Sequence, residues 1–151
     1  RQVSDAVDLP VIAAGGIATG RQMLAAMVLG ASGVQVGSRF VASLEASCHS
    51  NFKNAVINAA EGDTMLSLKA LTPVRLLKNK FFEQVQQAEF NGMSKEDLEK
   101  LLGRGRAKKG MFEGNLEEGE LEIGQVSSMI KTIKPAAEIL HEIWAEYNDL
   151  L

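Results

Sequence analysis

The hydrophobic pattern in the first third of the chain is that of a strand, a helix and a second strand. Two short apolar runs, Pro10–Ile17 and Gly33–Phe40, each lead straight into a glycine turn. The segment between them, Thr19–Gly30, has the length and the apolar spacing of one helix. Because a strand–helix–strand series of this kind joins parallel strands, the sequence predicts a βαβ unit of a parallel sheet.

The two glycine turns are expected to face one spot, since both follow the carboxyl ends of neighbouring parallel strands. A (β/α)8 barrel holds a phosphate after its seventh and eighth strands in this way. Glycine lets a backbone N–H approach a phosphate oxygen, Ser38 adds a hydroxyl donor, and a helix beginning after Gly16 would add partial positive charge. Gly15–Gly16 alone is also typical of a tight strand-to-helix turn, but its pairing with Gly37–Ser38 favours a phosphate site.

Two polar residues beside the second turn each have two interpretations. Arg39 could clamp a phosphate, but along a strand its side chain points opposite to Ser38, so an outer salt bridge is an equal alternative. Gln35 stands in an apolar strand, two residues before Gly37 and on the same face. Since a buried amide needs partners, Gln35 either lines the interior near the ligand or bonds to a neighbouring strand.

The rest of the chain has few strand signals, and the sequence predicts three segments: 1–44, 45–122 and 123–151. The middle segment is predicted to be mostly helical, and Ser94 is typical of an N-cap that begins one of its helices. One apolar stripe in it is expected to lie on a single helical face: Leu76, Leu77, Phe81 and Val85.

Two stretches near the carboxyl end complete the pattern. Leu116–Glu122 is polar and is expected to be exposed. From Ile123 the apolar positions recur at three and four residues, which predicts a helix, and Pro135–Leu151 is predicted to form the final helix.

Composition narrows the class of protein. The chain has 151 residues and is 46% hydrophobic, which is enough for a domain with a core. Its formal charge of −3, with acidic and basic residues evenly mixed, argues against a nucleic-acid partner. The sequence contains no run of 18 apolar residues, so it predicts no membrane-spanning helix. The single cysteine, Cys48, excludes an internal disulfide framework, so we expect a cytoplasmic, globular protein.

The other reactive residues point to structure rather than to chemistry. His141 lies in an apolar stretch of the last helix, where packing or surface exposure is the natural role. The adjacent Cys48 and His49 suggest nucleophilic catalysis, but neighbours in sequence seldom hold the geometry of a thiolate–imidazole pair. No spacing resembles a metal site. The basic stretch Arg104–Lys109 is typical of a solvated loop, with an acidic partner as the alternative interpretation.

Four motifs in order carry a family resemblance: Pro10–Gly20, Leu29–Phe40, His49–Lys53 and Gly124–Ser128. Together they resemble the 2-nitropropane dioxygenase family. That family contains the nitronate monooxygenases and the similar FMN-dependent enoyl-[acyl-carrier-protein] reductases of type II. The resemblance implies a (β/α)8 TIM barrel with FMN at its carboxyl-terminal mouth. Segment 1–44 would then be its last βαβ part, including the last two strands, followed by the helical insertion and the C-terminal helices that pack on the barrel.

The resemblance also implies which residues meet the cofactor. From the first turn it assigns Ala14, Gly15 and Gly16 to the FMN phosphate, and from the second strand and turn it assigns Gln35, Gly37 and Ser38. Ser38 stands where many relatives have Thr, which keeps the hydroxyl. Gln125 of the Gly-Gln motif would lie near the flavin or the substrate pocket.

The resemblance implies that the catalytic histidine precedes this stretch, and neither His49 nor His141 matches its position. No catalytic residue is therefore assigned in these 151 residues. The chain begins without Met and with a helical pattern under way over Arg1–Val7, so we expect it to be the carboxyl-terminal part of a longer protein. Alone it would lack the other barrel strands, fold poorly and be inactive.

Two reactions follow from the resemblance. Oxidation of alkyl nitronates by a nitronate monooxygenase is the first, and reduction of an enoyl thioester with NAD(P)H as electron donor is the alternative. The expected partners are a small-molecule or acyl-thioester substrate and the remaining barrel. An acyl carrier protein, for which Arg104–Lys109 would be a landing site, and a second copy in a homodimer are further candidates. A phosphate-binding barrel without flavin, as in inosine monophosphate dehydrogenases, and a helical interaction module remain open alternatives.

Overall fold

A computed structural model describes residues 1–151, which form two compact units. The βαβ unit comprises residues 1–46 together with 132–151, and the hairpin unit comprises residues 47–131. Contacts thus divide the chain after residues 46 and 131, whereas the sequence pattern suggested divisions after residues 44 and 122. None of the helices has the length and apolar character needed to cross a lipid bilayer.

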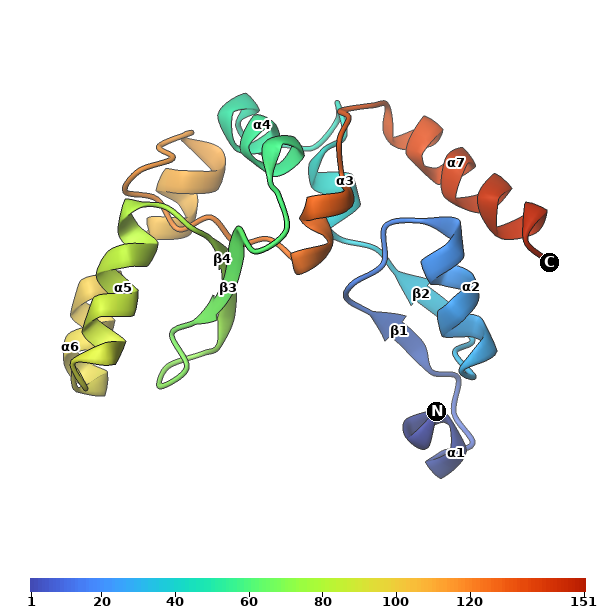
Figure 1. The fold of residues 1–151 in the computed structure, drawn as a ribbon, viewed down its shortest axis with the longest axis horizontal. Coiled ribbons are helices and arrows are strands. Elements are labelled where there is room, and N and C mark those ends of the chain that lie inside the picture. The colour runs from blue at the N-terminus through green and yellow to red at the C-terminus, as the bar shows by residue number, and fades with distance from the viewer. The chain divides into compact units, whose positions relative to one another are not determined.

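The predicted strand–helix–strand series is confirmed in the βαβ unit (Figure 1). Strand β1 (Ile12–Ala14) pairs in parallel with β2 (Gly33–Gln35), and α2 (Gly20–Val28) connects them. The two strands are in register from Ile12 opposite Gly33 to Ala14 opposite Gln35. Their carboxyl ends therefore lie together at one end of the two-stranded sheet.

Local sequence explains the limits of α2. Thr19 is its N-cap, with a hydroxyl that accepts a hydrogen bond from the backbone N–H of Gln22 at 3.2 Å. At the other end Gly30 has φ +101°, a left-handed conformation that glycine adopts without a Cβ penalty. The single helix predicted within Thr19–Gly30 is confirmed.

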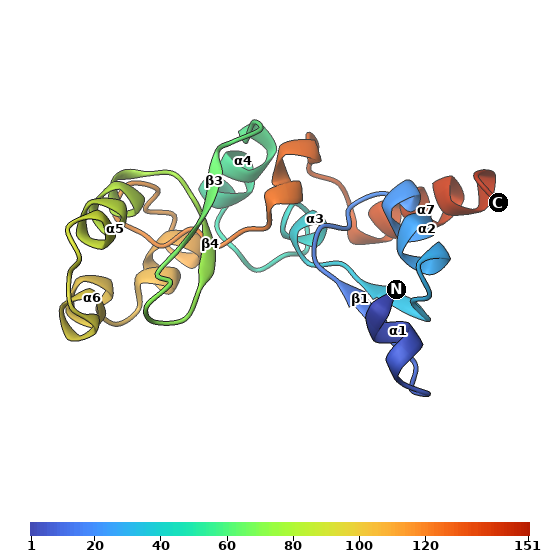
Figure 2. The same cartoon turned by 60° about the horizontal axis from the view of Figure 1, so that its bottom comes forward.

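The final helix packs on α2. Helix α7 (Ala136–Asp149) confirms the helix predicted near the carboxyl end, and it buries Ile139 and Ile143. Figure 2 shows α2 and α7 side by side. Two short helices complete this unit: α1 (Gln2–Ala6) and α3 (Ser38–Val41).

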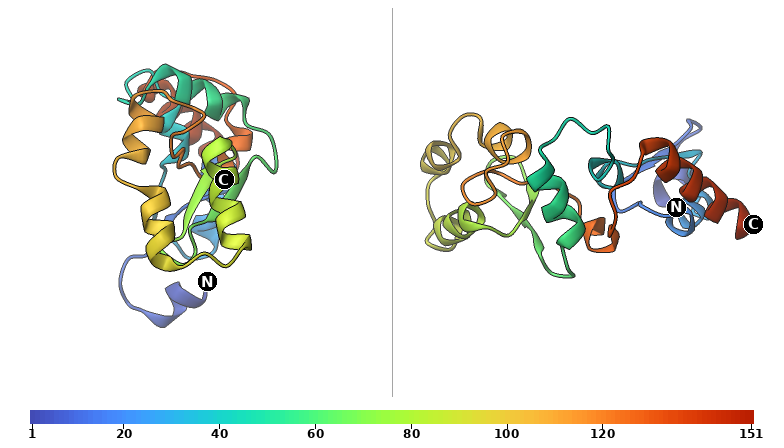
Figure 3. Two further views of the ribbon diagram at one scale, coloured as in Figure 1. Left: turned by 90° about the vertical axis from the view of Figure 1, so that its left-hand side faces the viewer. Right: turned by 90° about the horizontal axis from the view of Figure 1, so that it is seen from above.

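The hairpin unit combines helices with an antiparallel strand pair (Figure 3). Its elements are α4 (Ser50–Asn58), β3 (Thr64–Ser67), β4 (Val74–Leu77), α5 (Lys80–Phe90), α6 (Lys95–Leu102), the π-helix η1 (Lys108–Phe112) and the 3-10 helix η2 (Gln125–Met129). Ser94 is the N-cap of α6, as predicted, and its hydroxyl accepts from the N–H of Asp97 at 3.2 Å. One hydrophobic core lies between the hairpin and α5: Leu68, Leu76, Phe81, Phe82 and Val85.

The prediction of one helical stripe from Leu76 to Val85 is wrong. Leu76 lies in β4, paired with Met65 of β3, whereas Phe81 and Val85 lie on α5. The break falls at Asn79, whose side-chain oxygen accepts from the N–H of Phe82 at 2.8 Å and begins α5. The four apolar residues at helical spacing thus come from two elements that share one core. Over a short run, a strand and a helix that are each buried on one side can show similar patterns of apolar residues.

Two predictions near the carboxyl end are also corrected. Leu116–Glu122 is not an exposed stretch, because Glu120 and Leu121 are buried at 7% and 3% exposure. The backbone here is tied to β4, with the N–H of Leu77 donating to the carbonyl of Leu121 at 2.9 Å. After Ile123 the chain forms only the short 3-10 helix η2 before α7, although Val126 and Ile130 are buried as the apolar spacing suggested.

Candidate functional site

The first glycine turn directly follows β1 and leaves its outer side open. Gly15 and Gly16 have φ +92° and +71°, which side chains with a Cβ rarely adopt. Both are exposed, and a Cβ added to either would meet no heavy atom within 4 Å. No packing contact explains glycine here, so these two positions combine the required backbone conformation with free space for a ligand.

The second glycine turn is equally open but has an ordinary backbone conformation. Gly37 has φ −106° and is exposed, and a Cβ added there would again meet nothing within 4 Å. It lies two residues past Gln35, as Gly16 lies two residues past the register partner Ala14. The two turns therefore occupy equivalent places beyond the paired strand ends.

A short helix begins at the second turn. Gly37 is the N-cap of α3 and has no side chain to cap it, and its carbonyl accepts from the N–H of Phe40 at 2.9 Å. Two glycine turns beside the N-terminus of a short extra helix are the parts from which (β/α)8 barrels build phosphate sites. The arrangement presents backbone dipoles and the half-buried Ser38, and it suits an oxyanion such as a phosphate.

Ala14 and Gln35 close the paired strand segments. They are register partners at the last paired position, and both are exposed. The sequence predicts that Gln35 either lines the interior near the ligand or bonds to a neighbouring strand; its side chain is exposed here, and the assignment stays a prediction.

Arg39 belongs to the framework of the βαβ unit. Ser38–Val41 is helical, so the prediction based on alternating strand directions does not hold. Arg39 is buried at 8% exposure, and its Nη1 donates to the carbonyl of Thr132 at 3.1 Å. Burial lowers the pKa of the guanidinium, while the charges of Glu142 and Glu138 raise it. Arg39 fastens α3 to the segment that leads into α7.

The N-terminus of α2 is already satisfied by the protein. The N–H of Ala18 donates to Oε1 of Gln22 at 2.8 Å, and the N–H of Gly20 donates to Oε2 of Glu146 at 2.7 Å. Thr19 caps the next turn. The expectation that this helix end would add positive charge to the phosphate site is therefore corrected, because the carboxylate of Glu146 offsets it.

The two histidines have structural surroundings. His49 is the N-cap of α4, with Nδ1 accepting from the N–H of Asn51 at 3.1 Å, and its ring lies against Gly114. His141 is exposed on α7, and Cys48, the single cysteine, is half-buried and forms no disulfide. The capping role accounts for His49 without any nucleophilic chemistry.

The basic stretch is not a uniform solvated patch. Arg106 donates to the carbonyls of Leu101, Leu102 and Glu118, at 3.1, 3.0 and 2.9 Å, and its guanidinium lies 4.6 Å from the ring centroid of Phe81. Lys108 pairs with Glu113 at 3.4 Å. Arg106 thus satisfies the open carboxyl end of α6.

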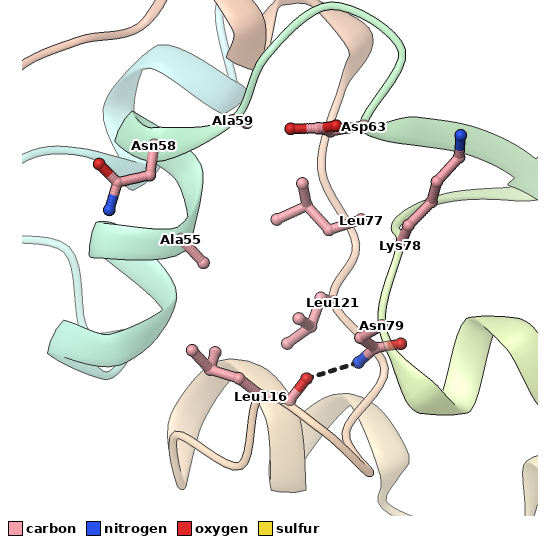
Figure 4. A pocket seen from close by; sticks show the side chains of 9 residues that line it. All are labelled: Ala55, Asn58, Ala59, Asp63, Leu77, Lys78, Asn79, Leu116 and Leu121. Carbon is pink, nitrogen blue, oxygen red and sulfur yellow. Dashed lines mark hydrogen bonds between the residues drawn. The ribbon is translucent and has the colours of Figure 1, made fainter.

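The hairpin unit also contains a cavity that the sequence did not reveal. Its volume is about 340 Å³, and it is lined by Ala55, Asn58, Ala59, Asp63, Leu77, Lys78, Asn79, Leu116 and Leu121. Figure 4 shows Ala55 and Leu77 pointing into it. Asn79 donates to the carbonyl of Leu116 at 2.8 Å, and Asp63 accepts from the N–H of Ala60 at 2.7 Å. No motif could have signalled it, since its walls come from separate segments.

Gln125 belongs to the hairpin unit, where it is the exposed first residue of η2. Its carbonyl accepts from the hydroxyl of Ser128 at 3.3 Å. The structure thus brings Ala14, Gly15, Gly16, Gln35, Gly37 and Ser38 together in one unit and places Gln125 in the other.

The chain is similar to known proteins over almost its whole length. The family model described as nitronate monooxygenase matches residues 1–146. The chain belongs to the nitronate monooxygenase family. Members of this family are flavin-dependent oxidoreductases. A curated relative, "Probable nitronate monooxygenase" of Staphylococcus aureus, is 34% identical over 99% of this chain and 42% of its own length.

Two solved structures are similar to almost the whole chain. FabK from Thermotoga maritima is 39% identical with a TM-score of 0.91, and the match covers 99% of this chain and 47% of that one. Nitroalkane oxidase from Streptomyces ansochromogenes is 30% identical with a TM-score of 0.78, covering 98% and 42%. The chain therefore has the mixed α/β fold of these enzymes and spans less than half of their length.

Proposed function

We propose that this chain forms the phosphate-binding part of an FMN-dependent oxidoreductase, with β1 and β2 as the last two strands of a (β/α)8 barrel. The observation that carries the proposal is the pair of open glycine turns at the carboxyl ends of two parallel strands. Gly15, Gly16 and Gly37 each leave the space of a Cβ empty. A phosphate fits such a site because backbone N–H groups reach its oxygens only where no side chain intervenes.

The residue assignments follow the two turns. Ala14, Gly15 and Gly16 would contact the FMN phosphate from the end of β1. Gln35, Gly37 and Ser38 would contact it from the end of β2 and the start of α3, with the Ser38 hydroxyl as a side-chain donor. Gln125, carried over from the family motif alone, is proposed to lie near the flavin or its substrate. When bound, FMN supplies the redox chemistry, and these residues hold its phosphate end.

For the intact protein we propose reduction of an enoyl thioester with NAD(P)H as the electron donor. Among the solved structures, FabK, an enoyl-[acyl-carrier-protein] reductase, is more similar to this chain than the nitroalkane oxidase in both identity and TM-score. Oxidation of nitronates is the second candidate, favoured by the Staphylococcus aureus relative. The sequence analysis placed nitronate oxidation first and enoyl reduction second. The motifs are common to enzymes of both reactions, so the proposal here follows the similarity to the solved structures instead.

The test is an absorption spectrum of the full-length protein, followed by anaerobic titration. Bleaching of a flavin band by NADH or NADPH, with turnover of an enoyl thioester, would support the reductase. A flavin band indifferent to either nucleotide but bleached by an alkyl nitronate would support the monooxygenase. A protein purified and reconstituted with FMN that shows no flavin band would contradict the proposed cofactor.

A further inference from the structure

A glutamate on the last helix reaches the residue that begins α2. Oε2 of Glu146 accepts from the N–H of Gly20 at 2.7 Å, although 126 positions separate the two residues. Gly20 is buried, and a Cβ there would collide with the backbone of Ile143, Glu146 and Tyr147. Helix α7 therefore lies with its backbone directly against the start of α2, and Glu146 bonds the two at that point.

This contact at Gly20 lies four residues after Gly16, the last residue of the first glycine turn. Between Gly16 and Gly20, Ile17 and Ala18 are buried at 7% and 6% exposure. The N–H of Ala18 is held by Gln22 at 2.8 Å. The exposed turn at Gly15 and Gly16 thus continues into a segment in which Ile17 and Ala18 are buried and the N–H groups of Ala18 and Gly20 are hydrogen-bonded, the second of them by Glu146.

The charge of Glu146 would by itself disfavour a phosphate nearby. Its carboxylate occupies the partly positive N-terminus of α2, which a phosphate dianion could otherwise use. The carboxylate of Glu146 therefore favours phosphate binding only if its effect on the conformation of the Gly15–Gly16 turn outweighs its electrostatic repulsion of the phosphate. The two effects predict opposite results when Glu146 is removed, so an experiment can separate them.

We propose that Glu146 is a positioning residue for the cofactor phosphate: by fixing the start of α2 to α7, it holds the Gly15–Gly16 turn in its binding conformation. The inference rests on the proposed function, since it concerns the same phosphate site. It assigns to the C-terminal helix a part in cofactor affinity, although no residue of α7 is assigned to contact the cofactor.

The experiment compares the affinity of the full-length protein for FMN and for riboflavin, which lacks the phosphate. Glu146→Ala removes the acceptor, Glu146→Gln keeps an acceptor oxygen without the charge, and Glu146→Asp keeps the charge on a shorter side chain. Asp149→Asn removes a charge from an exposed residue of the same helix and is the matched control. Dissociation constants are measured by quenching of flavin fluorescence.

We expect Glu146→Ala to weaken FMN binding about tenfold, the loss of one well-aligned hydrogen bond, and to leave riboflavin affinity within about twofold. Glu146→Gln should keep near-native FMN affinity, Glu146→Asp should weaken it, and Asp149→Asn should change nothing. If the alanine variant does not fold, the other two variants make the same comparison. The acceptor of Glu146→Gln reaches the N–H of Gly20, whereas that of Glu146→Asp is too short to do so.

Three results would overturn the inference while leaving the proposed function intact. They are unchanged FMN affinity in both the alanine and aspartate variants, equal weakening of FMN and riboflavin, or tighter FMN binding once the carboxylate is removed. A wild-type protein that binds FMN no better than riboflavin would overturn the phosphate site itself and this inference with it.

Discussion

The glycines of the open turns in the βαβ unit and those of a close backbone contact in the hairpin unit have opposite roles. In the turns of the βαβ unit, Gly15, Gly16 and Gly37 face open space. In the hairpin unit, an added Cβ at Gly110 would lie 2.6 Å from the carbonyl oxygen of Glu120, and one at Gly119 would collide with Gly110. The first group leaves room for a ligand, whereas the second lets two backbone segments touch.

This difference separates binding from stability. A substitution in the open turns is expected to change what the protein binds and to leave its folding nearly unchanged. A substitution at the closed contacts is expected to change folding first, because the neighbouring backbone cannot move aside cheaply. Four predictions for substitutions in the full-length protein test the comparison, in order of decreasing expected effect.

The largest effect is expected from Gly110→Ala in the hairpin unit. The new Cβ would contact Leu121 and the backbone of Glu120 and Gly119, so overpacking should cost about 3 kcal/mol of unfolding free energy. The measurement is the urea midpoint of the hairpin unit's transition. A midpoint equal to that of the wild type would show that this contact is not closed and would remove the contrast with the open turns.

A slightly smaller loss of stability, about 2 kcal/mol, is expected from Arg106→Ala. The guanidinium bonds three backbone carbonyls and lies over Phe81, so its removal leaves the end of α6 unsatisfied. Arg106→Lys should recover less than half of the loss, because an ammonium lacks the planar fork. The urea midpoint measures this. Normal stability with weaker binding of an acidic carrier protein would instead favour the docking interpretation of this stretch.

Gly37→Ala is the matched partner of Gly110→Ala in the βαβ unit. Its φ of −106° suits alanine and no atom lies within 4 Å of the new Cβ, so the melting temperature should stay within about 1 °C. The methyl group would hinder the approach of phosphate, and FMN affinity should fall about tenfold, or about 1.4 kcal/mol. Flavin fluorescence measures the affinity. Unchanged FMN binding would show that this open space is not used by the cofactor.

The smallest effect is expected at Glu120, where burial is the main cause of a raised carboxyl pKa and the nearby Glu122 raises it further. With the folded pKa above the unfolded one, stability falls as pH rises through that window. Glu120→Gln should therefore stabilise the protein at pH 7, and the gain should vanish as the pH falls through the raised pKa. Melting temperatures at a series of pH values measure it, with exposed Glu99→Gln as control. A gain independent of pH would contradict the role of charge burial.

Much of the βαβ unit could be predicted because its signals are local. A strand that runs into Gly15–Gly16, a helix capped by Thr19 and ended by Gly30, and a second strand before Gly37 are all readable within a few residues. The hairpin unit was harder to predict, because the apolar residues of β4 and α5 follow one continuous spacing. Their separation depends on the pairing of β4 with β3 and on the cap at Asn79 that begins α5, and apolar spacing alone shows neither of these.

The sequence by itself determined the parallel βαβ unit, the places of its glycine turns and the family to which the chain belongs. Only the tertiary structure decided which polar groups surround those turns. In the folded chain, Arg39 is buried and bonds the carbonyl of Thr132, Arg106 bonds the carboxyl end of α6, and Glu146 bonds the start of α2. The physical reason is range: capping and turn preferences act between neighbours, whereas burial and hydrogen bonding of a charged side chain depend on which distant segment packs beside it.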